Sequence, residues 1–184
     1  MLKFLLVILI IIVLIIVWLI STYNGLVRSR NTVDEAYSTM DVYLKKRFDL
    51  IPNLVEAVKG YAAHEKETLQ AVIAARGQIQ SAGTQAERME AENALTGTLR
   101  SLFAVAEAYP DLKANAGFLD LQQQLKKVEE DIANSRKYYN GTVRMLNTKV
   151  ETFPGVIFAK LFGFHSREMY EATPIQRSDV QVRI

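Results

Sequence analysis

The feature that most constrains this chain is an uninterrupted apolar run near the N-terminus, from Phe4 to Ile20. The run has no charged side chain, no Gly and no Pro. As a helix, its seventeen residues extend about 26 Å, close to the hydrocarbon thickness of about 30 Å. Trp18 and Tyr23 stand at its C-terminal end, where aromatic rings favour the membrane interface. The sequence therefore predicts a single-pass membrane protein, with residues 1–23 as the anchor in contact with the lipid bilayer.

A cleaved signal peptide is the alternative interpretation of this run. The apolar region of a signal peptide spans about 7 to 15 residues and precedes small residues at the cleavage site. Here the first Ala is Ala36, and the chain has no Cys for a lipoprotein anchor or a disulfide. The positive-inside rule compares Lys3 with Arg28 and Arg30. This excess of one basic residue after the anchor favours a cytoplasmic location for the soluble part, but it leaves the side of the membrane open.

After the anchor, apolar residues recur every three or four positions, which predicts amphipathic helices. No Gly-Pro or Ser-rich linker follows the anchor, so we expect the membrane helix to continue directly into the soluble part. Within "RFDLIPNLV" we expect a kink, with Asp49 as a cap and Pro52 in the first turn of a restarted helix. If the helix is continuous, Pro52 should bend it. The first stripe is Val33, Ala36, Met40, Leu44, Phe48 and Ile51.

The next helices are delimited by turn and cap signals. A second stripe should end near Arg76 and Gly77, which makes "GQIQSAGTQ" a loop. Thr84 and Glu87 form a capping box that starts another helix, and Pro110 interrupts it. The last long helix begins near Lys113 or Asn115 and carries the most regular stripe: Phe118, Leu121, Leu125, Val128, Ile132, Tyr139, Val143 and Leu146.

These patterns predict an all-α fold, an antiparallel bundle of three long helices over residues 24–165, although the last stripe also fits a coiled-coil seam. The segment from Phe153 to Phe164 is apolar and too short to span a bilayer. We expect it to be a short helix that packs on the bundle, because it has too few basic residues to hold anionic lipid. Insertion into the membrane interface is the alternative. The tail, residues 166–184, has no strong pattern.

Charged and polar residues do not assemble a complete catalytic or metal motif. The pair His64-Glu65 lacks the second His of H-E-x-x-H, because the fifth position is Thr68. Lys45, Lys46 and Arg47 point in three directions around a helix and form no patch. Basic and acidic residues are interspersed, 22 against 20, so a nucleic acid is not expected as a partner. We therefore expect no catalytic residue, metal or cofactor.

Carboxylates that could converge in space are the one chemical alternative that the sequence leaves open. An enzyme built on them is a third possibility, behind the structural and adaptor roles given below. The candidates are Glu65, Glu67, Glu107, Asp111, Glu129, Glu130 and Asp131.

Three motifs resemble the LemA family of bacterial proteins. They are the stretch from "YNGLVRSRNTVDEAY" to "VKGYAAHE", then "EAYPDLKAN", then "LQQQLKKVEEDIANSRKYYN", in that order. The resemblance runs from the anchor to about Phe164. It implies a membrane helix and a long-helix bundle in a bacterial envelope membrane, and it implies no enzymatic reaction.

We therefore expect a structural or interaction protein of the bacterial inner membrane that forms homo-oligomers through its helical part. The alternative is an accessory subunit that binds another membrane protein, such as an envelope protease.

Overall fold

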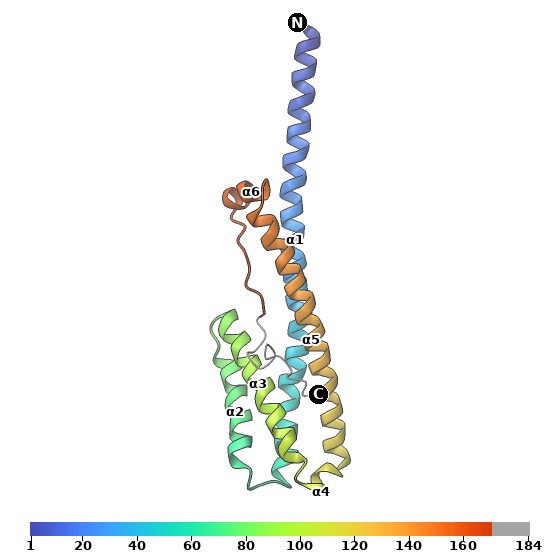
Figure 1. Cartoon of the computed structure of the whole chain (residues 1–184), viewed down its shortest axis with the longest axis vertical. Helices are drawn as coiled ribbons and strands as arrows, with labels where there is room; N and C mark the ends of the chain where they lie inside the picture. The colour runs from blue at the N-terminus through green and yellow to red at the C-terminus, as the bar shows by residue number, and fades with distance from the viewer. Residues whose placement is uncertain (171–184) are drawn as a thin grey trace, which may run out of the picture. The chain divides into compact units, whose positions relative to one another are not determined.

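The computed structural model describes residues 1–170, which form α-helices joined by turns (Figure 1). The all-α prediction is confirmed. Residues 171–184, most of the predicted tail, lie outside the described part. The helices are α1 (Leu2–Lys59), α2 (Lys66–Ser81), α3 (Gln85–Ala106), α4 (Pro110–Lys113), α5 (Ala116–Glu151) and α6 (Gly155–Phe162).

The contacts divide the chain into two compact units. Unit 1 contains residues 1–39 and 137–169, and unit 2 contains residues 40–136 together with Tyr170. The long helices α1 and α5 each contribute one part to each unit.

Helix α1 runs without interruption from the apolar segment into the bundle, as predicted. The side chains from Phe4 to Ile20 are exposed, and this segment is long and apolar enough to cross a membrane. The restart predicted at Pro52 is wrong, because α1 continues through it to Lys59. Asp49 is no cap and instead accepts a hydrogen bond from Lys45 Nζ at 2.8 Å.

The structure compensates for Pro52 through the neighbouring helix α2. Pro52 has no N–H, so the carbonyl oxygen of Phe48 lacks its usual intrahelical donor. Arg76 Nε donates to this oxygen at 3.5 Å, the long end of the hydrogen-bond range, and its guanidinium lies 4.0 Å from the centre of the Phe48 ring. This tertiary contact partly satisfies the backbone group that the proline leaves free.

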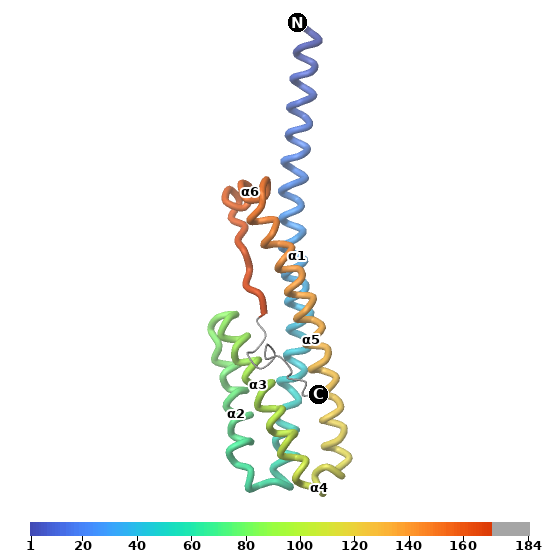
Figure 2. Tube along the Cα trace, in the orientation of Figure 1, coloured from blue at the N-terminus to red at the C-terminus, as the bar shows by residue number. Residues whose placement is uncertain are grey.

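In unit 2, α2 and α3 lie side by side and pack on the C-terminal part of α1 and the N-terminal part of α5 (Figure 2). Helix α2 passes through Gly77 and ends at Ser81, so the predicted loop is shorter than expected. A single Gly costs a helix only about 1 kcal/mol relative to Ala, and buried Leu69, Val72 and Ala75 hold α2 in place. The capping box of Thr84 and Glu87 is confirmed.

Helix α5 begins where Asn115 Oδ1 accepts a hydrogen bond from the backbone N–H of Phe118 at 2.9 Å. Its predicted stripe is buried except for Leu121, which is partly buried. The most regular apolar seam of the sequence is therefore covered within the chain.

In unit 1, α1 and α5 run antiparallel. Lys149 Nζ donates to Ser29 Oγ at 2.7 Å, and the rings of Tyr37 and Tyr139 are 5.8 Å apart. Helix α6 packs against α1 beside the apolar run, where Ala159 and Phe164 form a cluster with Leu26. The segment that follows runs along α5, where the side-chain amide of Asn147 makes two hydrogen bonds with the backbone of Arg167, at 2.8 and 2.9 Å.

Candidate functional site

The most unusual polar group in unit 2 is Arg47, because its side chain is completely buried. Arg47 stands on the core stripe of α1, three residues after buried Leu44 and four before buried Ile51. Lys and Arg are almost never fully buried unless they are paired. The packing of α1 on α3 and α5 therefore has to supply compensating partners.

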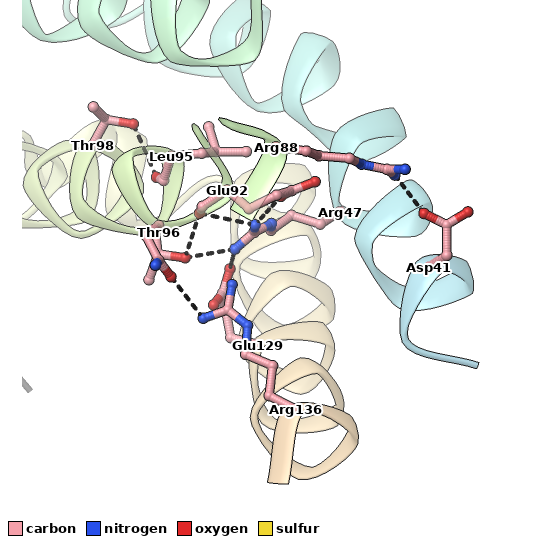
Figure 3. A network of polar contacts seen from close by, with 10 residues as sticks. Asp41, Arg47, Arg88, Glu92, Leu95, Thr96, Thr98, Glu129 and Arg136 are labelled. Carbon is pink, nitrogen blue, oxygen red and sulfur yellow. Dashed lines mark hydrogen bonds and ion pairs between the residues drawn. The ribbon is translucent and has the colours of Figure 1, made fainter. Parts of the chain in front are cut away.

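Those partners come from two other helices (Figure 3). On α3, the carboxylate and the backbone carbonyl oxygen of Glu92 both accept hydrogen bonds from Nη2 of Arg47, the second of them at 3.1 Å. Nη1 donates to Thr96 Oγ1 at 2.6 Å and to Glu129 Oε1 of α5 at 2.7 Å. The Thr96 hydroxyl in turn donates a hydrogen bond to the Glu92 carbonyl oxygen at 3.1 Å. One guanidinium thus connects α1, α3 and α5.

A second arginine completes the charge balance of this buried ion cluster, which we define as Arg47, Glu92, Thr96, Glu129 and Arg136. Arg136 Nη1 donates to Asn93 Oδ1 at 3.0 Å, and its guanidinium lies 4.2 Å from the centre of the Tyr170 ring. The cluster contains two cations and two anions, so its formal charge is zero. Neutrality matters here because an uncompensated buried charge is strongly destabilising.

The environment shifts the pKa values of these groups in opposite directions. For Arg47, burial is the largest single influence and lowers the pKa, but Glu129 and Glu92 together outweigh it and the pKa is raised. For Arg136, burial dominates and lowers the pKa from its ordinary value. Burial also raises the pKa of Tyr170 to about 12. Arginine remains protonated in proteins, so the cluster holds fixed charges rather than exchanging protons near neutral pH.

The geometry of the cluster fits a structural role, in which its charges hold α1, α3 and α5 in register. The side chain of Glu92 is 2% exposed, and its carboxylate is paired with Arg47. Glu129 is 32% exposed and lies at the edge of the cluster. Buried ionic groups can fix the register of packed helices, because a shifted register would leave their charges unpaired.

Beside Glu129 lies a groove between α3 and α5 with a volume of about 540 Å³. Leu99 and Phe103 provide its apolar lining, while Arg100 and Lys126 contribute positive charge. Thr96 and Glu129 of the buried ion cluster also line this groove, whereas Arg47 and Glu92 do not. The groove is therefore an open concave surface at the edge of the cluster.

The residues considered from the sequence as candidates for catalysis or metal binding lie in different parts of the structure. His64 is exposed in the turn after α1, and Glu65 accepts a hydrogen bond from Tyr109 Oη at 2.9 Å, which raises the pKa of Tyr109. Glu107 pairs with Lys113 on the surface. Of the seven candidate carboxylates, only Glu129 joins the buried ion cluster. Within residues 1–170, no group of three or more His, Asp or Glu side chains is arranged to hold a metal ion.

The sequence interpretation missed Arg47 and Glu92, and a signal for both was present. Glu92 stands three residues before Leu95 and therefore on the core stripe of α3, just as Arg47 stands on that of α1. Two opposite charges on the apolar stripes of different helices predict a buried pair. Considering Lys45, Lys46 and Arg47 only as a possible patch left out the comparison of Arg47 with the apolar stripe of its helix.

The fold and the cluster define a class: an all-α protein whose N-terminal helix fits single-pass membrane anchoring and whose bundle contains a buried ion cluster. The chain belongs to the LemA family, whose model matches residues 36–184.

Individual relatives agree with this family membership. The protein LemA of Metamycoplasma hominis is 25% identical over 158 residues, which cover 85% of this chain and 72% of the relative. The magnetosome protein MamQ 2 of Paramagnetospirillum magneticum is 24% identical, with 85% of this chain and 67% of the relative covered. MamQ of Magnetospirillum gryphiswaldense is 23% identical with the same coverage.

Proposed function

We propose that this protein is a non-catalytic structural protein of the bacterial cell membrane that associates with further copies of itself through its helices. In this proposal, residues 1–23 are the anchor, residues 24–165 the bundle and residues 166–184 a tail. The buried ion cluster stabilises the bundle and takes no part in a reaction. This role agrees with the paired state of Arg47 and Glu92, which leaves neither group directed at a ligand.

The observation that carries self-association is an exposed stripe on the outer face of α5. Tyr138, Gly141 and Met145 follow one another at spacings of three and four and are all exposed. This is the spacing of a heptad seam, and Gly141 would allow the backbone of a second helix to approach closely. The inner seam of α5 is already buried within the chain, so the outer stripe is the surface left for a second copy.

The test is the mass of the full chain in detergent as a function of concentration. The variant Tyr138→Glu/Met145→Glu should shift the protein to monomers, because it buries two charges in the contact. Ile73→Glu, at a similarly exposed apolar position on α2, is the matched control and should leave the mass unchanged. A wild-type protein that is monomeric at every concentration would contradict the proposal.

A second candidate function is an accessory subunit that binds another membrane protein through the groove between α3 and α5. The apolar lining by Leu99 and Phe103, with Arg100 and Lys126 beside it, fits an amphipathic helix that carries acidic residues. Purification from native membranes separates the two candidates. One heterologous protein at fixed stoichiometry, lost in Arg100→Glu/Lys126→Glu and retained in Tyr138→Glu/Met145→Glu, would favour the subunit role.

A further inference from the structure

Helix α6 and the turn that leads into it expose apolar side chains to an unusual degree. Phe153, Ile157 and Leu161 are 74%, 56% and 72% exposed. Ile157 and Leu161 are four residues apart and therefore lie on the same face of α6, and Phe153 lies in the turn just before the helix. We refer to these three side chains as the stripe. A short helix that leaves such a stripe uncovered points to a partner surface.

The opposite face of α6 is fixed to the rest of unit 1, so the stripe cannot turn inward. Ala159 and Phe164 are buried against Leu26 of α1. Gly155 lies so close to the backbone of Lys149 that a Cβ there would overlap its carbonyl oxygen. Gly163 ends the helix in the left-handed conformation, with φ of 72°. These contacts determine which face of α6 is presented to the outside.

The contacts of α6 with α1 place the stripe at the boundary of the apolar run. Trp18 and Thr22 line one small cavity of about 300 Å³ together with Phe153 and Pro154. Tyr23 makes an edge contact with Phe162, with 4.9 Å between the ring centres. Trp and Tyr at the end of a membrane helix lie at the level of the lipid headgroups. Helix α6 therefore lies at the same depth.

We propose that α6 is a second membrane contact, lying in the interface of the same bilayer that α1 crosses. Phe153, Ile157 and Leu161 enter the boundary between headgroups and acyl chains, which is where interfacial helices bury their apolar faces. Lys160, exposed beside the stripe, extends its ammonium group towards the phosphates, as lysines near a membrane surface do. The inference rests on the proposed membrane anchoring by α1 and is independent of self-association.

Two attachments have a mechanical consequence for unit 1. A single transmembrane helix can rotate and tilt in the bilayer, whereas a helix that spans it and a second that lies on it restrict both motions. The interfacial position of α6 therefore orients the bundle end of α1 relative to the membrane surface. The bilayer accounts for the exposed stripe better than a second copy, because Phe153 lies beside Trp18 at the end of the apolar run of α1.

The test uses the full chain in nanodiscs of phosphatidylethanolamine and phosphatidylglycerol. The protein has no Cys, so single variants carry one spin label each without further changes. Labels at Ile157→Cys and Leu161→Cys are compared with Ile12→Cys in the apolar run and Ile73→Cys on α2. Collision rates with oxygen, which concentrates in lipid, and with a water-soluble nickel chelate report the surroundings of each label.

We expect the ratio of oxygen to nickel collisions at positions 157 and 161 to exceed that at 73 several-fold and to approach that at 12. A ratio like that at 73, with position 12 in lipid, would overturn the proposal for α6 and leave the anchor intact. Aqueous values at position 12 would instead contradict the anchoring itself. Protection from both reagents, with spin–spin broadening that disappears on mixing with unlabelled protein, would show that a second copy covers α6 and would also overturn the proposal.

Discussion

Arg47 of α1 and Glu92 of α3 form an ion pair from which water is excluded, with 0% and 2% of the two side chains exposed. The pair joins residues 45 positions apart in the sequence. Glu129 adds the third helix at the partly exposed end of the cluster. A bundle with charges at this depth tolerates few alternative helix registers, because each shift leaves a charge without its partner.

Replacing Arg47 by Met should destabilise the bundle by about 3 to 5 kcal/mol, since Glu92 would remain buried and unpaired. Adding Glu92→Met should recover most of the loss. The measurement is urea unfolding of the full chain in detergent, followed by circular dichroism. Lys46→Met, at the exposed neighbouring position, is the control and should change stability by less than about 0.5 kcal/mol. Equal effects at positions 46 and 47 would contradict the buried pair.

Pro52 and Arg76 should be energetically coupled. In Pro52→Ala, the new N–H can donate to the Phe48 carbonyl, and we expect a gain of up to about 3 kcal/mol. Arg76→Ala should then cost about 1 kcal/mol less than it does in the wild type, because its hydrogen bond to that carbonyl has become redundant. A double-mutant cycle of unfolding free energies measures this difference. Strict additivity would show that Arg76 does not compensate for the proline.

Tyr170 should make the protein sensitive to alkaline pH. Its pKa is raised by burial to about 12, from the ordinary 10.0. The unfolded state therefore releases the phenolic proton first, so the contribution of Tyr170 to stability is complete below about pH 10 and is lost as the pH rises towards about 12. Tyr170→Phe should flatten the pH dependence of unfolding in this window, whereas exposed Tyr138→Phe should not. Identical profiles for both variants would contradict burial of Tyr170.

Labelling of a single introduced cysteine determines on which side of the membrane the bundle lies. The excess of Arg28 and Arg30 over Lys3 leads us to expect the bundle in the cytoplasm. In intact cells, Ile73→Cys should then resist a membrane-impermeant maleimide and react only after the membrane is opened. Rapid labelling in intact cells would place the bundle on the outer side of the membrane. A detergent-treated sample confirms that the thiol is reactive in either case.

Much of the fold follows from local signals in the sequence. The capping box at Thr84, the interruption at Pro110 and the start of α5 after Asn115 are short-range features, and all three are confirmed. The helix ends expected at Gly77 and Pro52 are absent for the same physical reason. Both are helix breakers by propensity, and in both places tertiary packing of the flanking apolar residues outweighs a local cost of about 1 to 3 kcal/mol.

The buried ion cluster required more than the local pattern. The stripe positions of Arg47 and Glu92 could have indicated a buried pair, but Thr96, Glu129 and Arg136 meet them only once α3 and α5 are packed.

The sequence by itself determined the apolar segment, the helical class and the starts of α3 and α5, because these depend on periodicity and on residues within one turn of each other. Only the tertiary structure decided which charges are buried, which face of α5 remains open and where α6 lies on α1. Those outcomes depend on contacts between segments far apart in the chain. Their free energies come from desolvation and charge pairing in the assembled bundle, and an isolated helix has neither.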